Sequence, residues 1–368
     1  MTDPKQPYNH LPHLPPKDFD VTDKDILIKS LSARSSLAAL NSALHVDKFS
    51  IAHALNMMSP LYVPEAVASS GVEEIITTNE SIYMERALGQ EDATLAEKEV
   101  MRYTEALAVG YRHLTKKGFL ATNQYVAMQR ALEPSRAGIR KVPGTQLANP
   151  STGAIYYTPP DNEKTIRSLL ANFEAVFNED APDHEALARA AILHYQFEAI
   201  HPFHDGNGRT GRILIPLYLT RQKVLFAPLL FASRYILKNR DEYYKLLRDV
   251  TFTGAWKQWV LYMLDALDEQ SQYTLGVLEK IYRFNDALAE RIKKYASEAK
   301  AEKIAELIYT NPFFTQQQFE EAVRVSPLTA RKYLLELASR GIIVRKKQPR
   351  RNRYLYACPE YVKLLRSV

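Results

Sequence analysis

Twelve consecutive residues, His201 to Arg212, carry the side chains of a phosphate-handling site. They read His-Pro-Phe-His-Asp-Gly-Asn-Gly-Arg-Thr-Gly-Arg, and the apolar residues that follow have helical spacing. A glycine-rich turn at the start of a helix, here Gly206-Asn207-Gly208, presents backbone N–H groups and the positive end of the helix dipole to an anion. The segment therefore predicts a binding site for a phosphate group.

The charged residues around this turn extend the prediction to catalysis. Arg209 and Arg212 lie three residues apart, so both are expected to project from one helix face and to clamp a polyphosphate. Asp205 offers a hard oxygen ligand for a phosphate-bound Mg²⁺. His201 can take a proton from an attacking hydroxyl near neutral pH. A base, a metal ligand, an anion site and a cationic clamp thus fall within one short segment.

Two other interpretations of the segment explain fewer of its residues. A structural turn with surface salt bridges would leave the glycines, the asparagine and the acid without a purpose. A hydrolase that binds a metal through His201, His204 and Asp205 would need at least one further ligand and would have no use for the arginine pair. We expect His204 to be structural.

The elements that must position this segment are expected to be mostly helices. The pattern is helical from Asp23 to about Leu114, and a helix capped by Asp183 is expected to run to about Ile200, directly before the site. Two β-prone runs, 142–147 and 154–158, flank turn residues and predict a β-hairpin.

The last part of the chain has a different order of elements. Thr315 to Gln318 form a capping box, and Ser326 followed by Pro327 starts another helix, which Gly341 ends. Two strands, 342–346 and 354–357, are expected to follow. This order predicts a winged helix-turn-helix.

The loop between these two strands is basic. Six Lys or Arg residues and no acid lie between Arg345 and Arg353. With Thr329, Arg331 and Lys332 on the preceding helix, this loop would suit DNA phosphates. Winged helices also dock on proteins, and a run of charges is commonly only solvated, so the sequence leaves the partner open between DNA and protein.

Composition sets the outer limits. The chain has 368 residues, a formal net charge of +6 and one cysteine, Cys358, which excludes an internal disulfide and fits a reducing compartment. Its most apolar stretch, 213–237, is interrupted by charged residues and cannot supply a membrane span. We expect a soluble, cytoplasmic protein without membrane contact, and the sequence leaves its oligomeric state open, a homodimer included.

The twelve residues resemble the His-x-Phe-x-Asp/Glu-Gly-Asn-Gly-Arg-x-x-Arg signature of the Fic family. The resemblance implies an all-α Fic fold with a β-hairpin flap, to which the C-terminal winged helix is added. The domains expected from it are a helical N-terminal region, 1–115, a Fic catalytic core, 116–298, and the winged helix, 299–368.

The resemblance also implies an activity and the residues that carry it. The usual family reaction transfers AMP from ATP, with Mg²⁺, to a Ser, Thr or Tyr hydroxyl of a target protein. His201 would be the general base and Asp205 the metal ligand. The implied ATP-binding residues are Glu73, His201, Gly206, Asn207, Gly208, Arg209, Thr210, Gly211, Arg212, Asn239 and Tyr243, and the implied target-binding flap residues are Ile155, Tyr156, Tyr157 and Thr158.

Ser69-Ser70-Gly71-Val72-Glu73-Glu74 resembles the inhibitory segment of the family, Ser/Thr-x-x-x-Glu-Gly/Asn. The resemblance implies that Glu73 pairs with Arg212 and displaces the γ-phosphate, or that it positions a water for removal of AMP. Glu74 departs from the pattern, and Gly71 weakens the expectation of a helix. Two other functions stay open: transfer of another phosphate-containing group, and a DNA-binding regulator whose Fic core only senses nucleotide. The phosphate-transferring branch has a lysine where this chain has Gly208.

Overall fold

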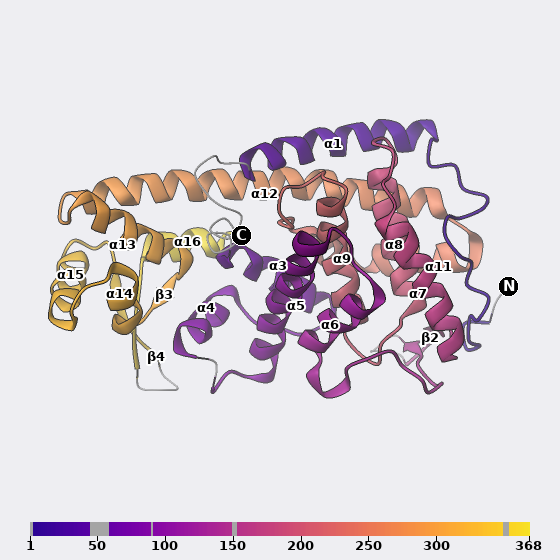
Figure 1. The fold of residues 1–368 in the computed structure, drawn as a ribbon, viewed down its shortest axis with the longest axis horizontal. Helices are drawn as coiled ribbons and strands as arrows, with labels where there is room; N and C mark the ends of the chain where they lie inside the picture. The colour runs from indigo at the N-terminus through magenta and orange to yellow at the C-terminus, as the bar shows by residue number, and fades with distance from the viewer. Residues whose placement is uncertain (1–2, 45–58, 90, 149–152, 349–352) are drawn as a thin grey trace. The chain divides into compact units, whose positions relative to one another are not determined.

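The computed structural model describes residues 3–44, 59–89, 91–148, 153–348 and 353–368 (Figure 1). The described chain forms two compact units that alternate along the sequence. The first takes in the N-terminal segment to residue 45, Ala68–Glu74 and Arg102–Tyr273, and the second takes in the remainder. The domain boundaries expected from the sequence stay a prediction.

The first unit is built from helices around a short hairpin. Its helices are α1 (Lys24–Leu44), the end of α3 (Tyr62–Val72), most of α5 (Leu95–Lys117), α6 (Thr122–Leu132), the 3₁₀ turn η2 (Pro134–Arg136), α7 (Glu163–Asn178), α8 (Ala186–Ile200), α9 (Asn207–Arg221), α10 (Ala232–Lys238), α11 (Arg240–Thr253) and the start of α12 (Trp256–Lys293).

Helix α8 lies at the centre of this unit, in contact with α1, α7 and α9 (Figure 1). Its sequence is apolar on all sides, which is typical of a helix buried all round, and nearly all of its residues are buried. An aromatic cluster packs beside it, with ring centroids 5.5–6.3 Å apart, formed by Tyr125, Phe173, Phe177 and Phe197. The helix that leads into the His201 segment therefore belongs to the rigid core.

The prediction that Asp183 caps this helix is wrong. The helix starts at Ala186, after a turn in which the Pro182 carbonyl accepts the N–H groups of Glu185 and Ala186. The Asp183 carboxylate pairs instead with Arg34, at 3.0 Å.

The hairpin is confirmed but shorter than expected. Strand β1 (Leu147–Ala148) pairs antiparallel with β2 (Ile155–Tyr157), with Leu147 opposite Tyr157. The run 142–147 joins the strand only at its last residue, because Pro143 has no N–H to donate and Gly144 has a φ of +109°. Turn residues 149–152 lie outside the described residues.

The second unit combines helices with a three-stranded sheet. Its elements are the 3₁₀ turn η1 (Ser59–Leu61), the start of α3, α4 (Asn79–Leu88), the start of α5, the end of α12, α13 (Glu298–Thr310), β3 (Phe313–Phe314), α14 (Gln316–Val323), α15 (Pro327–Ser339), β4 (Val344–Gln348), β5 (Arg353–Ala357) and α16 (Pro359–Arg366). The antiparallel strands have the order β3-β5-β4.

The local signals in this unit are confirmed. Thr315 and Gln318 form the capping box, Ser326 caps α15, and Gly341 follows that helix with a φ of +68°. Strand β3 and helix α16 were not predicted, and residues 349–352 of the basic loop lie outside the described part. The order of elements agrees with the expected winged helix, whose assignment stays a proposal. Among the described helices, none combines the length and apolarity that a membrane crossing requires.

Candidate functional site

The His201–Arg212 segment comprises the loop 201–206, which connects α8 to α9, and the first turns of α9. His201 ends α8 with a φ of +48°, and Gly206, with a φ of +79°, precedes α9. The Asn207 side chain accepts the N–H of Phe203 at 2.8 Å and donates to its carbonyl at 2.9 Å. The Thr210 hydroxyl donates to the Gly206 carbonyl at 2.7 Å. Asn207 and Thr210 thus fix the loop at the start of α9, a place where helices commonly bind anions.

Two buried side chains from outside the segment brace this loop, and sequence reasoning missed both. Arg140 donates from Nε to the His201 carbonyl at 2.7 Å, and its backbone N–H donates to the Pro202 carbonyl at 2.9 Å. Gln129 donates from Nε2 to the Asp205 carbonyl at 3.1 Å. Both act on main-chain groups, and no spacing in the sequence signals such contacts.

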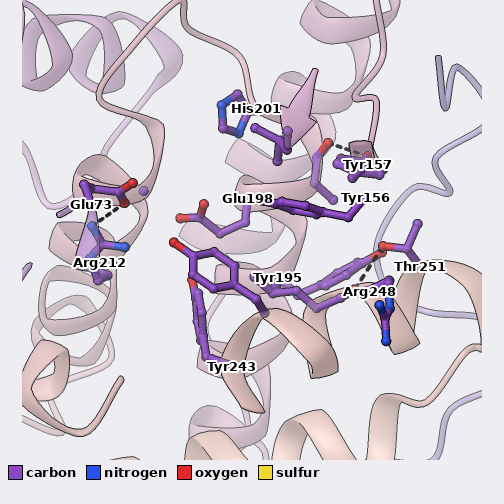
Figure 2. Close-up of a pocket in the computed structure, with 15 residues that line it drawn as sticks. Glu73, Tyr156, Tyr157, Tyr195, Glu198, His201, Arg212, Tyr243, Arg248 and Thr251 are labelled. Carbon is purple, nitrogen blue, oxygen red and sulfur yellow. Dashed lines mark hydrogen bonds and ion pairs between the residues drawn. The ribbon is translucent and has the colours of Figure 1, made fainter. Parts of the chain in front are cut away.

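Arg212 is buried and binds the end of α3. Its Nη2 lies 2.7 Å from Glu73 Oε1 and 3.0 Å from the Ser69 carbonyl oxygen, and its Nε donates to the Ser69 hydroxyl at 2.9 Å (Figure 2). Burial acts to raise the pKa of Glu73, but the charge and the hydrogen bond of Arg212, together with smaller contributions from Arg209 and His201, outweigh it and hold this pKa below its usual value. Glu73 is therefore ionised at neutral pH, and its side chain remains 36% exposed.

The Glu73 carboxylate lies against the glycine turn. A Cβ at Gly208 would overlap Glu73 Oε1 and would meet Arg212 Nη1 at 3.0 Å. The carboxylate therefore reaches this position only because residue 208 has no side chain. An acidic group thus lies beside the start of α9, where an anionic ligand would bind.

The end of the α3 segment differs from the expectation. The helix continues through Gly71 to Val72, and a Cβ at Gly71 would lie 3.2 Å from the Leu237 side chain, so the glycine permits close packing. Glu74 follows with a φ of +64°, a conformation that glycine and asparagine adopt more readily. Its carboxylate pairs with Arg240 at 2.9 Å.

The two arginines of the segment have different partners. Arg209 is buried and lies 2.7 Å from Glu133 and 3.6 Å from Asp205, whereas Arg212 binds Glu73. The Asp205 side chain is 61% exposed, and its Oδ1 accepts the N–H of Gly206. Its exposure leaves it accessible to a cation. No set of three or more His, Cys, Asp or Glu side chains suited to a metal occurs among the described residues.

A pocket of about 640 Å³, including the part open to solvent, connects Glu73, Gly208 and Arg212 to His201 and the flap, whereas Asp205 and Arg209 do not line it. In Figure 2, Glu73 and Arg212 lie on one side of it and His201 and Tyr157 on the other, with Glu198 and Tyr243 between them. The complete lining is Glu73, Leu147, Tyr156, Tyr157, Tyr195, Glu198, Ala199, His201, Gly208, Arg212, Tyr243, Tyr244, Leu247, Arg248 and Thr251.

Two titratable groups in the pocket have shifted pKa values. The pKa of His201 is lowered to about 4. Burial is the main cause, the nearby Arg140 charge acts in the same direction, and Glu73 opposes them. His201 is therefore neutral at pH 7 and can accept a proton. Burial raises the pKa of Glu198 to about 8, with Arg212 opposing and Glu73 adding to the rise. Glu198 is therefore mainly protonated at pH 7.

Helix α11 forms one wall of the pocket. Tyr243 lines it, and its hydroxyl lies 2.9 Å from His194 Nε2. Asn239 joins α10 to α11 and donates to the Tyr235 carbonyl, and it does not line this pocket. Sequence reasoning missed the other lining residues of α11, Tyr244, Leu247, Arg248 and Thr251, although their spacing places them on one helix face.

The flap residues have separate positions. The Tyr156 ring lies in the pocket, 6.2 Å from the Tyr244 ring between centroids. Tyr157 is buried and its hydroxyl donates to the Ala199 carbonyl at 2.7 Å. Ile155 pairs with Ala148 in the hairpin, and Thr158 is buried just beyond β2.

Gly211 lies on α9, where a Cβ would overlap the Glu198 carboxyl.

Fold and site together define a mainly helical protein with a pocket in which a buried arginine, a neutral histidine and a glycine turn meet beside a hairpin. Sequence comparison gives the family. The Fic/DOC family matches residues 113–219, and its N-terminal family matches residues 27–112. A Fido domain-containing protein of Dictyostelium discoideum is 38% identical over 103 residues, which cover 69% of its length and 26% of this chain. The chain belongs to the Fic/DOC family.

Other relatives and structures agree. Protein adenylyltransferase fic-1 of Caenorhabditis briggsae is 25% identical over 224 residues, 60% of this chain and 42% of that protein. The chain thus spans less than half the length of this relative. A Fic family protein of Desulfovibrio desulfuricans has the same fold, with a TM-score of 0.53 and 18% identity over 92% of this chain and 97% of that one. Fic-1 of Caenorhabditis elegans, residues 134–508, also has a TM-score of 0.53, with 22% identity over 69% of this chain and 73% of that one.

Proposed function

We propose that the chain transfers AMP from ATP to a Ser, Thr or Tyr hydroxyl of a target protein. The observation that carries this proposal is one pocket lined by both a buried guanidinium and a neutral imidazole, Arg212 and His201. The first can hold a polyphosphate and the second can accept a proton. The adenylyltransferase relatives support the same reaction.

The reaction needs one proton acceptor in this pocket. The target hydroxyl oxygen attacks the α-phosphorus of ATP, a new P–O bond forms, and the bond to pyrophosphate breaks with its electron pair on the leaving group. His201 accepts the hydroxyl proton. Its pKa of about 4 makes it a weak base in the free protein, and the negative charge of bound ATP would raise that pKa.

The loop supplies the phosphate contacts. The first-turn amides of α9, opened by Gly206, Asn207 and Gly208, would bind phosphate oxygens, and Arg212 would bind the far end of the polyphosphate. The exposed Asp205 carboxylate fits a ligand to Mg²⁺, which prefers carboxylate and phosphate oxygens. When bound, Mg²⁺ would neutralise phosphate charge.

Glu73 would restrain this reaction. Its carboxylate pairs with the Arg212 guanidinium and lies against Gly208. Arg212 is then not available to a phosphate, and a second negative charge lies beside the proposed phosphate site. ATP would then bind with its α-phosphate misplaced for attack. Release of Glu73 is therefore the proposed step that activates the enzyme.

Glu73→Gly tests the function and its restraint together. A hydrogen-bonded charge pair contributes about 1.5–3 kcal/mol, so its loss should raise AMP transfer about 10- to 100-fold. The measurement is label transfer from α-³²P ATP to proteins of a cell lysate. Glu74→Gly is the matched control, because that carboxylate pairs with Arg240 outside the site, and its effect should be much smaller.

Three outcomes of this experiment would contradict the proposal. If Glu74→Gly alone is more active than the parent, the restraint comes from Glu74 and not from Glu73. If neither variant is more active than the parent, the Glu73 segment does not restrain the reaction. Transfer of label from γ-³²P ATP, with none from the α-labelled form, would point to phosphate transfer instead.

A regulator that only senses nucleotide would need the glycine turn and Arg212 but no base. The neutral His201 in the pocket therefore favours an enzyme.

For residues 299–368 we propose a winged helix that binds a protein partner. The outward face of α15 carries Leu328 and Leu335, which are 67% and 62% exposed, beside Arg331 and Lys332. Base edges are read mainly by hydrogen bonds, so exposed leucines favour protein over DNA. Binding of a DNA duplex with steep salt dependence would reverse this choice.

A further inference from the structure

The N-terminal segment 4–14, here called the arm, contacts the exit of the flap. The backbone N–H of Tyr8 donates to the Thr158 carbonyl at 2.9 Å. The Thr158 hydroxyl in turn donates to the Pro4 carbonyl at 2.7 Å. Thr158 directly follows β2, so the arm bonds both the main chain and the side chain of the residue that ends the flap.

A second set of contacts lies further along the connection that follows β2. Asn9 Nδ2 donates to the Asp161 carboxylate at 2.9 Å, and the Asp161 N–H donates to Asn9 Oδ1 at 3.0 Å. This reciprocal pair fixes the chain three residues beyond Thr158. Because α7 begins two residues later, the arm spans the whole connection from the flap to that helix.

The other end of the arm is fixed to the helical core. The Leu14 N–H donates to Asn172 Oδ1 at 2.7 Å, and Asn172 Nδ2 donates back to the Leu14 carbonyl at 3.0 Å. Gln196, on α8, donates to the Pro12 carbonyl at 2.8 Å. The arm thus connects the flap exit to α7 and α8, the second of which ends at His201.

The flap needs such support. An isolated two-stranded hairpin is at best marginally stable in water, and these strands have only two and three residues. On the inner side, the Tyr157 hydroxyl bonds the Ala199 carbonyl, two residues before His201. On the outer side, the Tyr8 ring meets the Tyr157 ring edge-on at 6.5 Å between centroids. Tyr157 is therefore held between α8 and the arm.

We propose that the arm is a positioning element of the active site, which holds the flap in register with His201 so that a target strand is presented to the base. The proposal rests on the target-binding role proposed for the flap. Its key contacts are those of Tyr8, Asn9 and Pro4 with residues 158–161. Since none of them touches the phosphate site, the arm should govern the use of the target and leave ATP binding unchanged.

A matched pair of variants at Thr158 tests the arm directly. In a Glu73→Gly background, Thr158→Val removes the hydroxyl at nearly constant shape, and Thr158→Ser retains it. Asn9→Ala removes the second contact. Amide hydrogen exchange of residues 153–158 should become faster in Thr158→Val and Asn9→Ala, and should stay at the parent rate in Thr158→Ser. ATP affinity, measured by calorimetry, should be unchanged in all three and also reports folding.

The same variants are then assayed by label transfer from α-³²P ATP over a dilution series of lysate. For Thr158→Val and Asn9→Ala, the apparent KM for the labelled acceptor should rise about three- to tenfold, with kcat retained. Unchanged exchange of residues 153–158 would overturn the proposal while leaving the transferase function intact. Faster exchange with unchanged KM would overturn the positioning role. Absence of transfer by the parent would refute the proposed function, and the exchange result would still decide whether the arm orders the flap.

Discussion

At the scale of residues, the site depends on one guanidinium that serves two partners. Arg212 is buried, so it needs a hydrogen-bonding anion, and Glu73 supplies one at 2.7 Å. A γ-phosphate would supply another. In the proposed mechanism the two anions would compete for one position beside Gly208, where no side chain intervenes.

This competition predicts a specific interaction energy. Arg212→Ala should weaken productive ATP binding, and Glu73→Gly should then have no further effect on transfer. A double-mutant cycle of transfer rates should therefore be strongly non-additive. Rates that combine additively would show that the pair does not control activity.

The role of His201 can be separated from binding. His201→Ala should lower transfer by about 10²–10⁴, the usual cost of losing a general base. ATP affinity should be retained, because the loop and Arg212 hold the phosphates. The measurements are label transfer and calorimetric titration with ATP, and transfer at the parent rate would exclude this histidine as the base.

At the scale of elements, the contact between α8 and α9 determines where the charges of the pocket lie. Glu198, one turn before His201, lies over Gly211, where any larger residue would overlap its carboxyl. The closeness of the two helices desolvates this carboxyl and raises its pKa to about 8. At neutral pH the Glu198 carboxyl is therefore mainly protonated in the folded chain, whereas in the unfolded chain it ionises near pH 4.5.

The shift of Glu198 predicts a pH dependence of stability. Between about pH 4.5 and 8 the folded chain binds a proton that the unfolded chain has released, so this residue's contribution to stability falls as pH rises through the window. Glu198→Gln mimics the protonated acid and should lack this fall. Melting temperatures of both proteins from pH 5 to 9 provide the test, and parallel curves would contradict it.

The elements also show what the sequence could predict. The helices on either side of the His201 loop were predictable from their apolar spacing, and the capping signals of α14 and α15 act locally. Arg140 and Gln129 were not predictable, since they bond carbonyls far along the chain and any polar side chain in reach could do so. Asp183 misled because a turn and an ion pair with Arg34 replaced the cap.

At the scale of the whole molecule, the second unit draws on distant parts of the sequence. Helix α4 contacts α16 and β3, and the Glu80 carboxylate pairs with Lys346 at 2.5 Å and with Arg366. A chain that ends at residue 298 would leave α4 without these partners. The C-terminal segment is therefore only one part of its unit.

Truncation after residue 298 should affect the two units differently. We expect ATP binding by the first unit to persist, because the loop, Arg212 and the flap all belong to it. The remainder of the second unit should lose its own thermal transition, because α4 loses the apolar contacts that it buries. Calorimetry of both proteins, with and without ATP, would show this. Unchanged transitions after truncation would mean that α4 needs no C-terminal partner.

The interleaving of the two units has a mechanical consequence for Glu73. The segment Ala68–Glu74 belongs to the first unit, whereas the chain just before it and just after it belongs to the second. The backbone of Glu73 is thus continuous on both sides with chain of the second unit, and unwinding the last turn of α3 would lengthen this segment, since a helix rises 1.5 Å per residue and an extended chain about 3.3–3.6 Å. Under the proposed restraint, such an extension of α3 would move the Glu73 carboxylate directly, through the backbone and without a relay of side-chain contacts.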